Sequence, residues 1–166
     1  MGRLGIDDLE SLEEARLDKR DREELFAAQR ECSFVFLGEN GWPSGVVMNY
    51  LLVEGRFWLT SVEGRAQVRA LANDQRVSLV VSSAGSTLPG RRMVAVRGVA
   101  TVHRDLTSKA WLLDAFAEAF RPADPAPLRR LLDSPNRVVL EVRPVGVSSS
   151  HDHRKIPGVR SPGPGR

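Results

Sequence analysis

Apolar residues recur at every second position along much of the chain after residue 31, which is the period of a strand with one buried face. Turn residues such as Asn40-Gly41 and Glu54-Gly55 separate the first three of these runs at hairpin spacing. The pattern predicts strands at residues 32–37, 44–52, 56–61, 76–82, 91–103 and 137–144.

Helical periodicity fills the segments outside these strands. Acidic residues followed by Leu9, Leu12, Leu25 and Phe26, spaced for one-sided burial, predict helix within the first thirty residues. The same pattern predicts further helices at 64–73, 108–120 and 128–132.

The order of these elements predicts a mainly β fold with helices. The first strands are joined by turns too short for helical crossovers, so they should pair antiparallel. Gly98 interrupts the longest strand, where a bulge would let the sheet curl into a barrel. We expect one domain: a helical segment at 1–31, a six-stranded antiparallel barrel at 32–155, and a disordered tail rich in Pro and Gly at 156–166.

The charge distribution argues against a nucleic-acid-binding protein. The net charge is +3, but four of the 24 basic and one of the 21 acidic side chains lie from His151 onward, so residues 1–150 carry 20 of each. A neutral body lacks the basic face that reads a phosphate backbone.

The single cysteine and the hydropathy pattern indicate the cellular compartment in which the protein works. Cys32 lies in an apolar run and cannot form an internal disulfide, which fits a reducing compartment. No run approaches the roughly twenty apolar residues of a membrane span, and no N-terminal signal segment is visible. We expect a cytoplasmic protein without membrane contact.

The string from residue 57 to residue 71 joins a strand end to a helix start. Thr60 and Ser61 close the strand, and Gly64 and Arg65 precede the helix. Backbone N–H groups, hydroxyls and a guanidinium shaped for phosphate oxygens would meet there. This arrangement suits a phosphate, although an ordinary strand-to-helix connection with a solvated arginine has the same local sequence.

Several strings along the chain match one family in order and spacing. They are the turn and strand at 41–49, the strand and helix at 56–71, the strands at 76–81 and 96–102, and the closing segment at 150–155. Together they resemble the pyridoxamine 5′-phosphate oxidase-like flavin-binding split barrels, which include flavin- and deazaflavin-dependent reductases. The resemblance covers residues 22–155 and implies a six-stranded antiparallel split β-barrel of the FMN-binding type.

The resemblance also implies where a cofactor would lie. Thr60, Ser61 and Arg65 fall where relatives hold the cofactor phosphate, and the strand at 46–49 falls beside the ring. Relatives usually have a lysine at the position of Gln67, so a charged contact becomes a neutral one here. Arg92 is the candidate to reach across from a second subunit. The implied cofactor-binding residues are Val46, Val47, Met48, Asn49, Thr60, Ser61, Arg65, Gln67 and Arg92.

By the same resemblance, the chain would be a flavin-type oxidoreductase that transfers a hydride to or from a small organic substrate. The implied cofactor is FMN or the 8-hydroxy-5-deazaflavin coenzyme, bound at a homodimer interface. No catalytic residue is identified, because the cofactor itself supplies the chemistry. The alternative is a non-catalytic flavin- or haem-binding barrel, which Gln67 in the lysine position favours. His151 and His153 have no third ligand nearby, so we expect no metal site.

Overall fold

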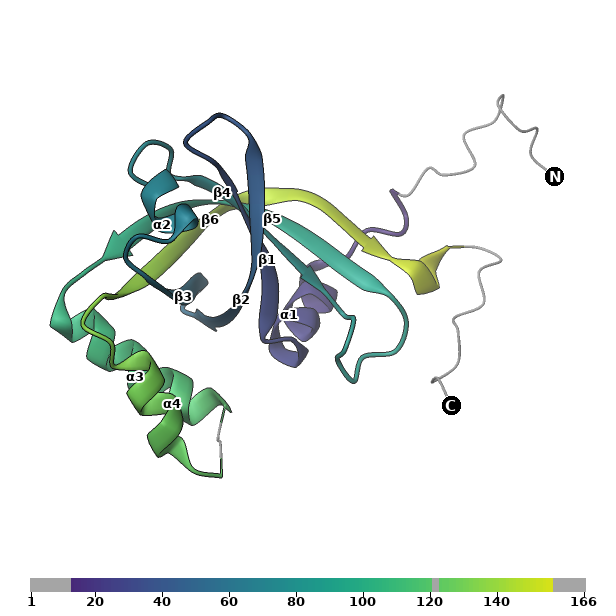
Figure 1. Cartoon of the computed structure of the whole chain (residues 1–166). Helices are drawn as coiled ribbons and strands as arrows, with labels where there is room; N and C mark the ends of the chain where they lie inside the picture. Colours follow the sequence, from purple (N-terminus) through teal and green to yellow (C-terminus); the bar gives the residue numbers. More distant parts are fainter. Residues whose placement is uncertain (1–12, 121–122, 157–166) are drawn as a thin grey trace.

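The computed structural model describes residues 13–120 and 123–156, and these form a closed barrel in the strand order β1-β2-β3-β6-β5-β4 (Figure 1). All neighbouring strands pair antiparallel, which confirms the predicted fold class. The strands are β1 (Glu31–Leu37), β2 (Pro43–Val53), β3 (Arg56–Val62), β4 (Arg76–Ser82), β5 (Arg92–His103) and β6 (Arg137–Asp152).

The last strand is about twice as long as its hydrophobic pattern predicts. Beyond Val142 most of its side chains are exposed, so the alternation that marks a strand disappears from the sequence. The segment is held instead by backbone pairing with β5, which continues to the pair Arg92↔Asp152. Register shifts between Ala95 and Val96 and between Arg97 and Gly98 bend this long ribbon, and the second lies at the predicted bulge.

Within the described residues, α-helices flank the barrel, with α1 on one side and the adjacent helices α3 and α4 on another (Figure 1). The helix α2 is only five residues long, much shorter than the predicted span of 64–73. The cap of α3 is Asp105, whose carboxylate accepts a hydrogen bond from the Ser108 amide. The helices are α1 (Lys19–Ala28), α2 (Ala66–Ala70), α3 (Leu106–Phe120) and α4 (Pro125–Leu132), and a 3-10 turn follows at His153–Lys155.

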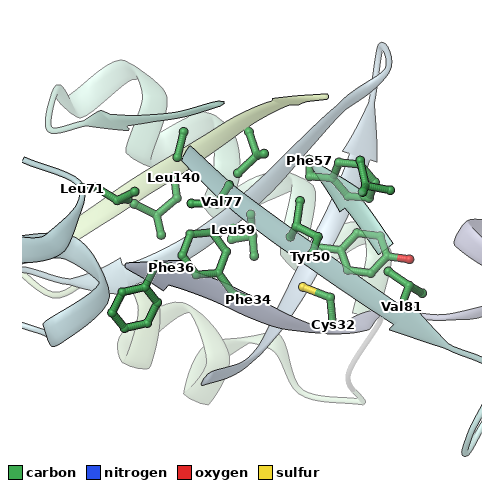
Figure 2. Close-up of a cluster of buried hydrophobic side chains, with 14 of the residues drawn as sticks. Cys32, Phe34, Phe36, Tyr50, Phe57, Leu59, Leu71, Val77, Val81 and Leu140 are labelled. Atoms are coloured by element: carbon green, nitrogen blue, oxygen red, sulfur yellow. The ribbon is translucent and has the colours of Figure 1, made fainter. Parts of the chain in front are cut away.

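The main core fills the inside of the barrel. Inward positions of successive strands alternate with outward ones, as in Phe57 and Leu59 of β3, and their side chains meet at the barrel axis (Figure 2). Tyr50 and Phe57 pack edge to face with ring centroids 5.3 Å apart. Burial raises the pKa of the Cys32 thiol to about 12, so this thiol is inert packing.

A second apolar cluster joins the α3–α4 pair to the outside of the barrel. Leu112 and Phe116 of α3 and Leu132 of α4 are buried against Leu51 of β2 and Val139 of β6. This packing fixes the two helices over the outer face of β3 and β6. None of the helices in the described segments is long and apolar enough to cross a membrane.

The bulge at Gly98 provides a test of the barrel geometry. A Cβ atom on Gly98 would lie 2.4 Å from Cγ1 of the buried, β-branched Val142 and 3.1 Å from the carbonyl oxygen of Arg143. We expect Gly98→Ala to lower the free energy of unfolding by about 1–3 kcal/mol in denaturant titrations. Gly146→Ala is the matched control, since its Cβ would meet nothing within 4 Å. Equal stabilities of the two variants would contradict this geometry.

Candidate functional site

Eight of the nine predicted cofactor-binding residues line one cleft. This cleft, called the arginine cleft below, has a volume of about 710 Å³ and lies between β2, the β3–α2 connection and the α3–α4 pair. Such a volume is typical of small-molecule sites. The lining residues are Val46, Val47, Met48, Asn49, Thr60, Ser61, Val62, Arg65, Gln67, Phe116, Phe120, Leu128, Leu131, Leu132 and Arg137.

Hydrogen bonds within the chain decide which polar groups of the cleft remain available. The Thr60 hydroxyl donates to the carbonyl of Val138 at 3.1 Å, so its proton is engaged in joining β3 to β6. The Gln67 amide, only 8% exposed, donates to Ser61 Oγ at 3.1 Å. Ser61 therefore accepts a bond and keeps its own hydroxyl proton for a ligand.

Arg65 is the exposed cation of the cleft. It precedes α2 as the N-cap residue, and its side chain makes no capping bond. It also forms no ion pair with any other described residue, so its guanidinium is free to meet an anion. Because α2 has barely more than one turn, its dipole adds little, and the attraction for an anion rests on the arginine.

Arg137 is a second cation of the cleft, which the sequence pattern did not reveal. It opens β6 and lies opposite Val62 in the β3 ladder, so its side chain leaves the same outer face as Thr60 and Val62, whereas Ser61 faces the barrel interior, and both reach the cleft at the end of β3. Its Nε and Nη2 atoms donate to the carbonyls of Leu132 and Leu131 at 3.2 and 2.7 Å. Partial burial lowers the pKa of its guanidinium, and no carboxylate of the described chain pairs with it. Among the residues that the structure describes, the lining of the cleft thus holds two arginines and no acid.

Part of the cleft lining is apolar. It is called the apolar wall, and it consists of Phe116, Phe120, Leu128, Leu131 and Leu132 from α3 and α4. The rings of Phe116 and Phe120 are stacked with centroids 5.3 Å apart. Leu131 is 66% exposed, as is Val47 of β2, although both residues line the cleft. The cleft therefore offers both cations and open apolar surface, and Arg137 lies where the two meet.

The residues of β2 divide between the barrel core and the outside. Val46 and Met48 pack partly against the main core, whereas Val47 and Asn49 are exposed. Among these four residues of the cleft, only Val47 and Asn49 have side chains that are exposed to solvent. The alternation means that the side chains and the backbone of β2 would both contribute to any contact with a ligand.

Arg92, expected to reach a cofactor site from a second subunit, does not line the arginine cleft of its own chain. Its side chain is 2% exposed and forms ion pairs with Glu24 and Asp152 of its own chain. Arg154 and Lys155 pair with Asp152 and Asp21 in the same region. These contacts fasten α1 to the end of β6, so Arg92 has a structural role within its own chain.

Two other clefts of similar size differ in charge. One, of about 530 Å³, contains Arg76, which is paired with Asp74. The other, of about 540 Å³, contains Trp58, Trp111 and Arg56, and Arg56 is paired with Glu141. Both of these clefts are lined by an acidic residue, Asp74 in the first and Glu54 in the second. They therefore differ from the arginine cleft, whose described lining contains cations without an acid.

Histidines do not assemble a metal site in the part of the chain that the structure describes. His103 is hydrogen-bonded to Glu141, with 2.7 Å between Nε2 and Oε2. The rings of His151 and His153 are 6.2 Å apart. No group of three or more potential metal ligands occurs among residues 13–120 and 123–156.

Comparison with known proteins identifies the family. The family model described as pyridoxamine 5′-phosphate oxidase matches residues 20–151. The chain belongs to this family. A search of curated proteins found no significant match.

Solved structures with the same fold come from proteins of diverse kinds. A conserved hypothetical protein from Mycobacterium tuberculosis, Rv2991, superposes with a TM-score of 0.74 at 20% identity and covers 93% of this chain and 96% of its own. The haem storage protein HutZ from Vibrio cholerae has a TM-score of 0.65 at 12% identity, with coverages of 80% and 94%. A protein described as F420 reductase has a TM-score of 0.58 at 20% identity, with coverages of 76% and 94%. These similarities extend over nearly the whole barrel and show the shared fold.

The buried amide of Gln67 gives a test of the cleft in the unliganded protein. Gln67→Lys should lower the free energy of unfolding by about 1–3 kcal/mol, because it breaks the bond to Ser61 and places an ammonium in a confined position. Gln67→Met is similar in size and also loses the bond to Ser61, but it adds no charge. The difference between the two variants therefore measures the cost of the confined ammonium. We expect the lysine variant to be the less stable in thermal unfolding. If it were as stable as wild type, Gln67 would not be enclosed as described.

Proposed function

We propose that the protein is an oxidoreductase that binds a phosphorylated flavin-type cofactor in the arginine cleft and transfers a hydride to or from a small organic substrate. The observation that supports this most is that Arg65 and Arg137 both line the cleft, together with Ser61, while none of the described lining residues is acidic. Two uncompensated cations and a free hydroxyl fit a dianionic phosphate. The cofactor would be FMN or the 8-hydroxy-5-deazaflavin coenzyme, which share a ribityl phosphate.

Each part of the cleft has a task in this proposal. Arg65 and Ser61 would hold phosphate oxygens by charge-assisted bonds, and the strand around Val47 and Asn49 would lie along the ring. The apolar wall would exclude water from the side where the substrate enters. A bound flavin or deazaflavin supplies the hydride chemistry, so the chain needs to bind and orient rather than to provide a nucleophile.

The names of two structural neighbours support a flavin-type ligand. One is the F420 reductase above, and another is described as an FAD-binding protein from Mesorhizobium loti, which has a TM-score of 0.58 at 18% identity and coverages of 81% and 93%. We further propose a homodimer, because Val47 and Leu131 leave apolar surface exposed at the edge of the cleft. A second copy of the chain would cover that edge and complete the site.

A haem-binding protein without catalytic activity is the second candidate. The likeness to HutZ and the neutral Gln67 in the lysine position favour it. A haem would place its macrocycle on the apolar wall and its carboxylates on the arginines. The absorption spectrum of the purified protein with FMN, the deazaflavin coenzyme or haemin discriminates between the candidates, because the three absorb differently.

The contribution of Arg65 is directly measurable. Arg65→Ala should weaken binding of the cofactor by about ten- to hundredfold, since it removes a charge-assisted contact of about 1.5–3 kcal/mol. Calorimetric titration of FMN and of the deazaflavin coenzyme measures the change. Arg69→Ala is the control, because Arg69 lies on the same short helix but outside the cleft and pairs with Glu39. Failure of both cofactors to bind the wild type saturably would refute the proposed function.

A further inference from the structure

We infer that Arg137 supplies the second positive charge for the cofactor phosphate, in place of the lysine absent at Gln67, and couples this contact to the position of α4. The inference rests on the proposed function of the arginine cleft. It assigns a phosphate-binding role to a residue that belongs to none of the strings by which the family was recognised.

The β3–β6 ladder places Arg137 where such a charge is needed. Val62 pairs with Arg137, so the arginine leaves the outer face of the ladder at the end of β3, and its side chain reaches the cleft that Ser61 borders from the inner face. Thr60 fixes this register through its bond to the Val138 carbonyl. Arg65 approaches the same cleft from the β3–α2 connection. The two guanidinium groups therefore come from separate elements on either side of the end of β3.

Gln67 cannot provide the charge itself. Its amide is neutral, buried and already bonded to Ser61 Oγ. Arg137 in turn has donors to spare: its five N–H groups include two at Nη1, and the described chain offers that atom no partner. A partly buried guanidinium without a carboxylate is unfavourable until an anion compensates it. A phosphate beside Nη1 would provide this compensation.

The same guanidinium holds the C-terminal end of α4. Its bonds to the carbonyls of Leu131 and Leu132 satisfy two acceptors that the eight-residue helix leaves open. A helix of this length is not stable alone, so its position depends on such contacts and on packing. Because Leu128, Leu131 and Leu132 belong to the apolar wall, a phosphate on Arg137 would also steady the surface that receives the substrate.

The experiment compares FMN with riboflavin, which lacks the phosphate, and in parallel the deazaflavin coenzyme with the ribityl deazaflavin that lacks the phosphate. Arg137→Gln should lower the affinity for the phosphorylated member about tenfold or more and leave the affinity for the other member within twofold. Arg137→Lys should retain much of the preference for phosphate. Arg143→Gln, an exposed arginine of the same strand outside the cleft, should behave as wild type.

Hydrogen exchange of the wild-type protein tests whether phosphate binding at Arg137 stabilises α4. In the wild type, FMN or the deazaflavin coenzyme should slow exchange of the α4 amides more than the matching phosphate-free compound does at equal saturation. This difference should disappear in Arg137→Gln. If that variant does not fold, the wild-type measurement alone still shows whether the phosphate slows exchange in α4.

The possible failures are distinguishable. If wild type binds neither phosphorylated cofactor, or Arg65→Ala leaves the preference for phosphate unchanged, the proposed function fails. If Arg65→Ala abolishes the preference while Arg137→Gln keeps it, or weakens both ligands of a pair equally, the role of Arg137 in phosphate binding is overturned. Unchanged α4 exchange in the wild type on binding overturns the coupling.

Discussion

The antiparallel pairing of β6 with β3 is the constraint on which the rest of this structure depends. It closes the barrel between segments about 75 residues apart in sequence, from Arg56–Val62 to Arg137–Asp152. The Thr60 side chain reinforces it by donating to the Val138 carbonyl. Without this ladder, Arg137 would not reach the cleft at the end of β3, and α4, which ends shortly before β6, would have no fixed position over the barrel. The site is thus a consequence of barrel closure.

The local patterns of the sequence were sufficient for the barrel and for one half of the cleft. Alternating burial and short hairpin turns determine β1 to β3, and the residues expected at the cofactor on β2, β3 and α2 lie together because they are neighbours in this meander. The extent of β6 could not be predicted, since beyond Val142 backbone pairing rather than apolar periodicity holds it. The place of Arg137 in the cleft and the burial of Arg92 could not be predicted for a related reason, because both depend on partners remote in sequence: β3 for Arg137, and Glu24 and Asp152 for Arg92.

The chemistry of the cleft follows from the separation of its charges and its apolar surface. Cations without acids attract an anionic group, and a wall of leucine and phenylalanine side chains suits a flat apolar one. A phosphorylated flavin has both features in one molecule. In the proposed site, Gln67 is neutral where a lysine is expected, and Arg65 and Arg137 would supply the charge near the end of β3. The affinity for phosphate would then depend on two elements, one of which would also support the substrate side.

The most direct test of this account is a heteronuclear NMR titration of the wild-type protein with FMN and with the deazaflavin coenzyme. The account predicts saturable shifts, for at least one of them, at the amides of residues 46–49 and 60–67 and at the side-chain Nε–H groups of Arg65 and Arg137. Shifts concentrated instead around Trp58 and Trp111, or around Arg76, would place the ligand in one of the other clefts. That result, or the absence of any saturable shift with either cofactor, would contradict the central claim that the arginine cleft binds a flavin phosphate.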